Sequence, residues 1–382
     1  MPDQVSMKEH ECSSSGGCER CERSQDIPAG AGRLLLHVPV RHMRARVTDA
    51  LDGCGDPWSV QEDDRNGGRV YAVTTRDVLV LAGALLPRLS DEELIVVRAM
   101  LEPQGTAASR ADYFASRAVG TLLHRTRQRW LGDLLDDRRL MSYFQPIVGA
   151  ADPHEIYGYE CLMRGRRPDG EVGLIYPDEL LAAAHDADLL PPLDLAARLA
   201  AIQGAASHGI REAIFINFSP AAIYDPAFCL RSTIAAVTAA GLSPAQIVFE
   251  VTESERLPSN PGHLIGILDY YRAAGFRVAL DDVGSGYSSL VMLGDVRPDF
   301  LKLDKGLTNG VMGDPFRAVI AEKLIEAALG TGMAIVAEGI ETAKAAQWFQ
   351  DRGVQYLQGY YFARPAAVPP RVLMETPGSA PS

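Results

Sequence analysis

Polar side chains end a series of short apolar runs in the second half of the chain. Each run is rich in Val, Ile, Leu and Phe, and a carboxylate or amide stands within it or at its end. These polar residues are Glu160, Asn217, Glu250, Asp281, Asp282 and Glu338, with Lys302 in a further run and Gln358 in the last. An apolar strand gains nothing from a carboxylate at its tip. The recurrence therefore predicts that these residues share one site.

The chemistry of such a site follows from its charge. Carboxylates that converge on one point repel one another unless cations lie between them. Oxygen ligands of this kind suit Mg²⁺ or Mn²⁺. Two such ions can bind a phosphodiester, activating a water on one side and stabilising the leaving oxygen on the other. We therefore expect metal-dependent chemistry on a phosphodiester.

Each residue also has a simpler interpretation. A single acid at a strand end is usually a solvated rim residue. Glu338 could begin a helix after Gly339, where acids favour the helix dipole. Asp281 and Asp282 could cap a turn, and Lys302 could form a surface ion pair worth ~0–1 kcal/mol. Taken together, these alternatives do not explain why the acids recur at strand ends.

The apolar runs predict the elements that position these residues. Eight strands are expected from Met141 onward, with helical stretches between them. Their ranges are 142–148, 156–164, 213–219, 246–252, 277–281, 300–304, 334–338 and 356–362. Strands that alternate with helices predict parallel βα units. Eight units favour an α/β fold of the (β/α)8-barrel type, in which the strand ends form the active-site mouth.

A small α/β domain is expected before the barrel. Strands are predicted over 33–38, 58–61 and 69–74, with a turn at Asn66-Gly67-Gly68 and a helix over 40–51. A capping box at Ser90–Glu93 predicts a helix that continues through Leu94, Val97 and Leu101. The predicted organisation is a Cys-rich leader (1–32), a small α/β regulatory domain (33–121), a connecting helix (122–140), the barrel (141–370) and a disordered tail (371–382).

Composition excludes several classes of protein. With 47% hydrophobic and 23% charged residues, the 382-residue chain is not wholly disordered. A net charge of −12 argues against a partner that is a DNA or RNA polymer, since phosphate contacts need a basic face. No signal sequence or run long enough to span a membrane is visible, so a cytoplasmic location is expected.

The leader contains metal-type residues at His10, Cys12, Cys18 and Cys21. A Cys-x₂-Cys pair is one half of a typical zinc site, and His10 or Cys12 could complete it. No second tight pair follows. Zinc binding, a redox role and unpaired thiols therefore remain open.

The order of motifs from about Ser142 to Pro365 resembles the EAL-domain family, phosphodiesterases that hydrolyse cyclic di-GMP to linear pGpG. The resembling segments are Phe144-Gln-Pro-Ile147, Tyr159-Glu-Cys-Leu-Met-Arg164, Ile216-Asn-Phe-Ser-Pro220, Phe249-Glu-Val-Thr-Glu253, Ala279-Leu-Asp-Asp-Val-Gly-Ser-Gly-Tyr-Ser-Ser-Leu290, Lys302-Leu-Asp304, Ala337-Glu-Gly-Ile-Glu341 and Gln358-Gly-Tyr-Tyr-Phe-Ala-Arg-Pro365. The resemblance implies an EAL-type barrel whose first strand can be antiparallel, and a role in bacterial second-messenger signalling that regulates biofilms or motility.

The resemblance also implies roles for individual residues. Two Mg²⁺ or Mn²⁺ ions would be bound by Glu160, Asn217, Glu250, Asp281, Asp282 and Glu338. The catalytic residues would be Glu160, Lys302, Glu338 and Asp282, with Lys302 orienting or helping to deprotonate the attacking water. Gln145, Arg164, Asp304 and Gln358 would serve substrate binding, and Gln358 would also position Glu338. Glu253 would anchor the loop that links a homodimer interface to the metals.

Three positions depart from the family pattern. Cys161 stands where alanine is usual, and a small apolar thiol suits a structural role there. Val283 replaces an aromatic residue, which would alter dimer-linked regulation, and Lys305 replaces an arginine. None of these changes removes an implied metal ligand.

The leading hypothesis is a metal-dependent cyclic di-GMP phosphodiesterase that the N-terminal domain regulates. The alternative is a non-catalytic cyclic di-GMP receptor that signals through the same domain. A third possibility is a scaffold whose leader binds a protein partner.

Overall fold

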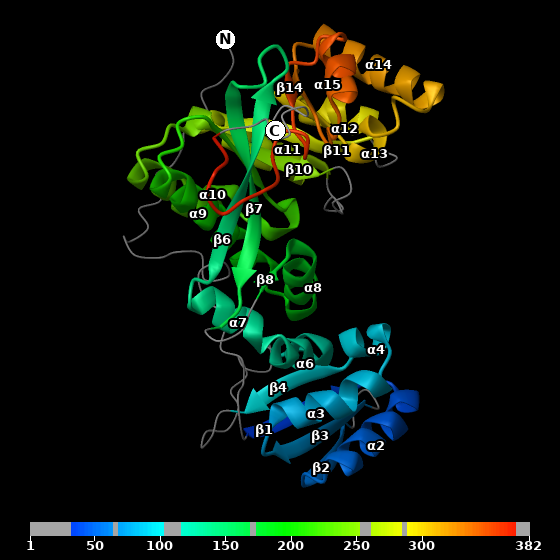
Figure 1. Ribbon diagram of the computed structural model, residues 1–382. Helices are drawn as coiled ribbons and strands as arrows, with labels where there is room; N and C mark the ends of the chain where they lie inside the picture. Colours follow the sequence, from blue (N-terminus) through cyan, green and yellow to red (C-terminus); the bar gives the residue numbers. More distant parts are fainter. Residues whose placement is uncertain are drawn as a thin grey trace, which may run out of the picture.

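The computed structural model describes residues 32–63, 68–102, 116–168, 173–252, 261–284 and 289–371. Within these ranges, a five-stranded antiparallel sheet with the order β2-β3-β1-β4-β5 comes first. Its strands are β1 (Gly32–Val38), β2 (Trp58–Asp63), β3 (Gly68–Thr75), β4 (Arg98–Glu102) and β5 (Arg117–Ala118). Helices α2 (Arg44–Cys54) and α3 (Val78–Leu85) lie on one face of this sheet (Figure 1). Short 3₁₀ turns occupy η1 (Arg41–Met43) and η2 (Leu86–Arg88).

Alternation along the strands builds the core of this N-terminal unit. Leu34, Leu36 and Val38 are fully buried at every second position of β1 and join the side chains of the helices. The predicted small α/β unit is therefore present.

One N-terminal helix is shorter than predicted. The capping box at Ser90 is present, but α4 (Asp91–Val96) ends before Val97, whose backbone is extended. Leu101 lies in β4, where it pairs with Leu34 of β1, so the helix predicted to reach it was wrong. The backbone hydrogen bonds of this segment are made with β1 instead of within a helix, because tertiary pairing overrides the local spacing.

The predicted connecting helix is two helices, α6 (Val119–Arg127) and α7 (Arg129–Asp136). The backbone leaves the helical region at Gln128, with φ −92° and ψ 22°. Arg138 then adopts a left-handed conformation with φ 52°, and β6 begins at Leu140. Amphipathic spacing continues across Gln128 in the sequence, which is why the break was not visible there.

In the described part of the chain, eight further strands close into a barrel, as predicted. They are β6 (Leu140–Gly149), β7 (Ile156–Arg166), β9 (Ala213–Asn217), β10 (Ile247–Thr252), β11 (Arg277–Val283), β12 (Phe300–Leu303), β13 (Ala334–Ala337) and β14 (Tyr356–Leu357). Strand β6 is antiparallel to both of its neighbours, and all other pairs in the closed ring are parallel. The expectation of an antiparallel first strand is confirmed. A short strand, β8 (Leu174–Ile175), adds to the end of β7.

Helices cover the outside of the barrel (Figure 1). They are α8 (Pro177–Ala187), α9 (Leu190–Ser207), α10 (Pro226–Ala239), α11 (Pro261–Ala273), α12 (Ser289–Val296), α13 (Lys305–Thr308), α14 (Pro315–Gly330) and α15 (Ala343–Gln350), with 3₁₀ turns η3 (Pro220–Ala222) and η4 (Pro244–Gln246). Among the described residues, no helix is both long and apolar enough to cross a membrane.

An apolar layer fills the floor of the barrel. It consists of Ile147, Ala213, Phe215, Val248, Ala279, Phe300 and Val336. Gly158 adds no side chain to this layer, because a Cβ there would lie 2.6 Å from the carbonyl oxygen of Ala213. The next inward positions, two residues along each strand, are where the predicted site residues lie.

Candidate active site

The barrel floor positions the site by the period of two along a strand. Phe215 is followed two residues later by Asn217, Val248 by Glu250 and Phe300 by Lys302. The same two-residue step gives four more pairs: Gly158 and Glu160, Ala279 and Asp281, Val336 and Glu338, and Tyr356 and Gln358. The polar residues are thus the second inward layer of the barrel, lying above the apolar one.

Lys302 lies at the centre of this layer and has no exposed surface. Its Nζ lies 2.6 Å from Glu250 Oε1, 2.7 Å from Glu338 Oε1 and 3.1 Å from Asp281 Oδ1. Glu160 Oε2 is 3.8 Å away. The prediction that these residues converge is confirmed, and Lys302 is not a surface residue.

Three amides frame the carboxylates. Asn217 Nδ2 donates to Glu250 Oε2 at 2.9 Å and to Glu160 Oε1 at 3.3 Å. Gln358 Nε2 donates to Glu160 Oε2 at 2.7 Å and to Gln145 Oε1 at 3.2 Å. Gln358 therefore positions Glu160 in this structure, whereas the sequence analysis assigned it to Glu338. A Cβ on Gly359 would lie 2.1 Å from the carbonyl oxygen of Ile340, so only glycine permits the close approach that follows Gln358.

An irregularity in β11 brings two consecutive aspartates to the site. The pairing of β11 with β12 shifts register between Leu280 and Val283. Asp282 has φ 56°, and its backbone N–H donates to Asp281 Oδ1 at 2.9 Å. Bulges of this kind re-aim side chains next to functional sites. Without the shift, neighbouring side chains would point to opposite faces of the strand.

Burial and repulsion perturb the charges of the cluster. Burial raises the pKa of Glu250 well above its usual range, although Lys302 opposes this effect. Burial acts in the same direction on the pKa of Glu338. Burial and the charge of Asp281 raise the pKa of Asp282 to about 6. The surrounding carboxylates outweigh burial at Lys302 and raise the pKa of its ammonium well above its usual value.

The cluster fits two divalent cations. Oxygens of Glu160, Glu250 and Asp281 lie within 4.8 Å of one another, and so do those of Asp281, Asp282 and Glu338. Five carboxylates and one ammonium leave a formal charge of −4, which two divalent cations would balance. Glu250 Oε1 and Glu338 Oε1 are buried and accept no hydrogen bond of good geometry. Such oxygens have coordination capacity left for a metal ion.

A buried ion pair on α9 fixes the turn that carries Asn217. Asp194 and Arg198 lie one helical turn apart with nitrogen and oxygen 2.8 Å apart, and both are almost fully buried. The other oxygen of Asp194 accepts from the backbone N–H of Ser219 at 2.8 Å, and Arg198 Nη1 donates to Thr233 Oγ1 at 2.6 Å. This pair was not among the residues predicted from the sequence. Its signal was an acid and a base at i, i+4 in an otherwise apolar helix.

Two of the predicted substrate residues lie outside the carboxylate cluster. Arg164 lies between the rings of Tyr143 and Tyr176, further along β7. Asp304 caps α13 and accepts from the backbone N–H of Gly306 at 2.7 Å. Glu253 and the leader residues His10, Cys12, Cys18 and Cys21 fall outside the described residues. Cys161 is buried against the helical layer, and burial raises the pKa of its thiol.

A cavity of about 380 Å³ adjoins the cluster at Asn217. Cys161, Met163 and Ile216 line it from the barrel, and α8 and α9 form the opposite wall. The lining is mainly apolar, with His185 and Asp194 among its polar groups. Cys161 and Met163 alternate with Glu160 and Arg164 along β7, so this part of the lining lies on the opposite face of the strand from those two residues.

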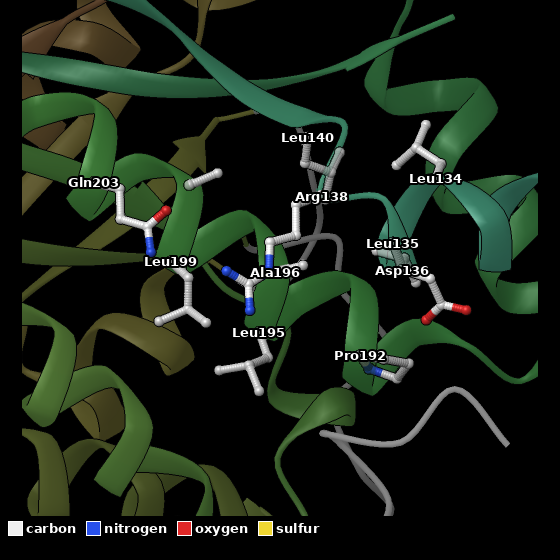
Figure 2. Close-up of a pocket in the computed structure, with 11 residues that line it drawn as sticks. Leu134, Leu135, Asp136, Arg138, Leu140, Pro192, Leu195, Ala196, Leu199 and Gln203 are labelled. Carbon is white, nitrogen blue, oxygen red and sulfur yellow. The ribbon is translucent and has the colours of Figure 1, made fainter. Parts of the chain in front are cut away.

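A second cavity of about 380 Å³ lies between the end of α7 and the outer side of α9. The Arg138 side chain extends toward Ala196 and Leu199 across this space (Figure 2). Leu195 lines this cavity and immediately follows Asp194. The connecting helix α7 and the barrel helix α9 are therefore separated by a cavity where they meet.

Comparison with known proteins supports one family. The family model described as "EAL domain" matches residues 128–365. The chain is 31% identical over 348 residues to the probable cyclic di-GMP phosphodiesterase PdeG of Escherichia coli K12, covering 87% of this chain and 66% of PdeG. It is 30% identical over 229 residues to the probable cyclic di-GMP phosphodiesterase PdeN of the same organism, covering 58% of this chain and 42% of PdeN. The chain thus spans less than two thirds of these relatives.

Among solved structures, the cyclic di-GMP-bound form of a standalone EAL protein from Vibrio cholerae O395 matches with a TM-score of 0.55 and 34% identity. The match covers 61% of this chain and 95% of that one. Because the family model covers well over half of the chain and the strand order, motifs and acidic cluster agree with it, this chain belongs to the EAL-domain family.

Proposed function

We propose that this chain hydrolyses cyclic di-GMP to linear pGpG with two Mg²⁺ or Mn²⁺ ions. The main support is the pair of carboxylate groups that share Asp281 above the barrel floor. Glu160, Asn217, Glu250 and Asp281 would hold one ion, and Asp281, Asp282 and Glu338 the other. When bound, two such ions would stabilise negative charge on phosphodiester oxygens and lower the pKa of water.

The protein's own residues position the metal ligands and orient the attacking water. The reaction adds a water oxygen to phosphorus and breaks the bond from phosphorus to the 3′ oxygen, which leaves with a proton. Lys302 is held among the ligands, where its ammonium can orient the attacking water. Gln358 and Asn217 hold Glu160 in place.

We propose that the N-terminal unit regulates this site through α8. Arg125 of α6 is 5% exposed, and its Nε donates to the Ala187 carbonyl oxygen at the end of α8 at 2.6 Å. Its Nη2 donates to the Asp188 carbonyl oxygen at 3.1 Å. Tyr176, which directly precedes α8, lies against the Arg164 guanidinium, with 5.1 Å between its ring centre and the guanidinium carbon. Movement of α6 would therefore reach a predicted substrate residue.

We also propose that the chain forms a homodimer. Large apolar side chains are exposed on α12, on α14 and just before α14: Val291 (73%), Met312 (51%), Phe316 (74%), Val319 (53%) and Ile320 (40%). Helix α12 follows soon after Asp281 and Asp282, so association here would lie close to the metal ligands. Replacing Phe316 with Asp should shift the mass in solution from dimer to monomer, as measured by light scattering.

Product analysis tests the enzymatic proposal. The full chain is incubated with cyclic di-GMP and Mn²⁺ or Mg²⁺, with Glu160→Ala and the surface variant Glu326→Ala run in parallel. Wild type and Glu326→Ala should form pGpG, and Glu160→Ala and EDTA-treated protein should not. Bound nucleotide without pGpG in wild type would refute hydrolysis and support the receptor alternative. Absence of binding would refute both.

A further inference from the structure

A stripe of side chains leads away from the carboxylates along the β6–β7 ribbon. Gln145 pairs with Glu160, Tyr143 with Leu162, and Met141 with Arg164. Residues directly opposite one another share a face, and so do alternate residues along each strand. Glu160 and Arg164 are thus on one face, about 13 Å apart along the strand.

Arg164 is held in this stripe by two aromatic rings. Its guanidinium carbon lies 5.4 Å from the centre of the Tyr143 ring and 5.1 Å from that of Tyr176. The residue is 9% exposed. Within the described part of the chain, the guanidinium donates only to the Met163 carbonyl oxygen, at 2.7 Å, and its Nε has no acceptor. The rings hold a cation that has donor capacity left for an anionic ligand.

Tyr176 presents its ring to solvent beside Arg164. It is 57% exposed, although the ring is large and rigid. It directly precedes Pro177, the first residue of α8, and its extended backbone (φ −91°, ψ 164°) fixes where the side chain emerges. An exposed tyrosine beside an arginine is the arrangement that proteins use to stack nucleobases.

We propose that Tyr176 is a specificity-determining residue that stacks on a guanine base of the substrate, next to Arg164. This inference rests on the proposed function and names a recognition element for the same site. The alternative is that Tyr176 only supports Arg164 by packing. The two roles differ in their dependence on Arg164. Stacking on a base needs the Tyr176 ring whether or not Arg164 is present, whereas support through the cation–π contact acts only while Arg164 is there.

Steady-state kinetics and equilibrium binding on the full chain separate the two. KM is measured with Mn²⁺, and the Kd of cyclic di-GMP is measured in EDTA. The variants are Tyr176→Leu, Tyr176→Phe, Arg164→Ala, the double variant Arg164→Ala/Tyr176→Leu, and the control Tyr270→Ala, at an exposed tyrosine of α11. Stacking predicts that Tyr176→Leu raises KM and Kd about 5- to 150-fold while kcat stays within about twofold. Tyr176→Phe and Tyr270→Ala should match wild type.

The results that would refute stacking differ from those that would refute hydrolysis. Wild-type affinity in Tyr176→Leu would overturn stacking, and so would equal losses in Tyr176→Leu and Tyr176→Phe. A double variant that binds no more weakly than Arg164→Ala would also overturn it, because Tyr176 would then act only through Arg164. If wild type binds cyclic di-GMP without forming pGpG, the proposed hydrolysis fails, while the Kd comparison still decides the role of Tyr176. If wild type binds no cyclic di-GMP, both proposals are refuted.

Discussion

Lys302 Nζ and Glu250 Oε1 lie 2.6 Å apart, and neither side chain has any exposed surface. A buried ammonium is costly unless anions surround it, and buried carboxylates are costly unless cations do. Each residue therefore offsets the energetic cost of burying the other's charge in the metal-free protein. Metal ions would add to this compensation rather than replace it, because one ammonium cannot balance five carboxylates.

Replacing Lys302 with Met should affect stability and turnover separately. Loss of the ammonium leaves buried carboxylates without a partner, so the free energy of unfolding in EDTA should fall by about 3–5 kcal/mol. With saturating Mn²⁺, pGpG formation should fall at least about 100-fold. Urea denaturation and product analysis measure the two effects. Lys323→Met, at a surface lysine that pairs with Glu326, should change neither. Wild-type turnover in Lys302→Met would exclude Lys302 from catalysis.

The stability of the metal-free protein should decrease as pH rises. The pKa of Asp282 is raised to about 6 in the folded state, against ~3.9 in an unfolded chain. The folded protein therefore binds the extra proton more tightly, so the contribution of Asp282 to stability is complete below the unfolded pKa and is lost as pH rises through about 6. The raised pKa values of Glu250 and Glu338 act in the same direction.

Urea denaturation in EDTA at about pH 5 and about pH 7.5 checks this dependence. Asp282→Asn removes one titrating group, so its free energy of unfolding should fall less over the same interval. Saturating Mn²⁺ should reduce the dependence in wild type, since cation binding requires deprotonated carboxylates. Equal slopes in the two proteins would show that Asp282 is not perturbed in this way.

Arg198 should tune metal affinity from outside the cluster. It holds Asp194, which in turn accepts from the Ser219 backbone two residues after Asn217. Arg198→Met leaves Asp194 buried without its cation, so the Asn217 turn should loosen and the half-saturating Mn²⁺ concentration should rise about tenfold or more. Direct Mn²⁺ binding by calorimetry measures this independently of turnover. Arg198→Lys should recover part of the affinity.

The control for this change is Arg231→Met, at an arginine that stacks on Phe228 on the outer side of α10. It should bind Mn²⁺ as wild type does. A merely structural role for Arg198 would lower stability while leaving the Mn²⁺ affinity of the folded protein unchanged. That result would exclude Arg198 as a positioning residue.

The barrel could be predicted because its sequence signals are local. Each strand is a short apolar run, and a polar residue two positions beyond an inward apolar one is visible in the sequence, as in Phe215 and Asn217. The contacts that those residues make with one another were harder to predict from the sequence. Gln358 contacts Glu160 rather than Glu338 because β14 pairs with β6 across the closure of the barrel, and no local pattern encodes that contact.

The remaining differences also arise from long-range packing. Leu101 follows helical spacing from Leu94, but the pairing of β4 with β1 places it in a strand. Tyr176 carries no motif of its own, and its position beside Arg164 depends on where α8 begins against β7. The Asp194–Arg198 pair was present in the sequence as an i, i+4 spacing, but only burial shows that it matters.

Arg125 should transmit the state of the N-terminal unit to the barrel. Arg125→Ala removes donors from the last carbonyls of α8, so the end of that helix should open more readily. Amide hydrogen exchange in α8 should become faster, and KM for cyclic di-GMP should rise about threefold or more because α8 begins beside Arg164, a predicted substrate residue. Arg129→Ala, at an exposed arginine of α7, is the matched control.

The two readouts together separate coupling from simple destabilisation. If Arg125 only stabilised the N-terminal unit, Arg125→Ala would speed exchange in β1 and β3 and leave α8 and KM unchanged. If Arg125 couples the two parts, α8 must respond, since its final turn is where the guanidinium binds. Faster exchange in α8 with an unchanged KM would show that the contact exists but does not reach the site, and the regulatory route through α8 would be wrong.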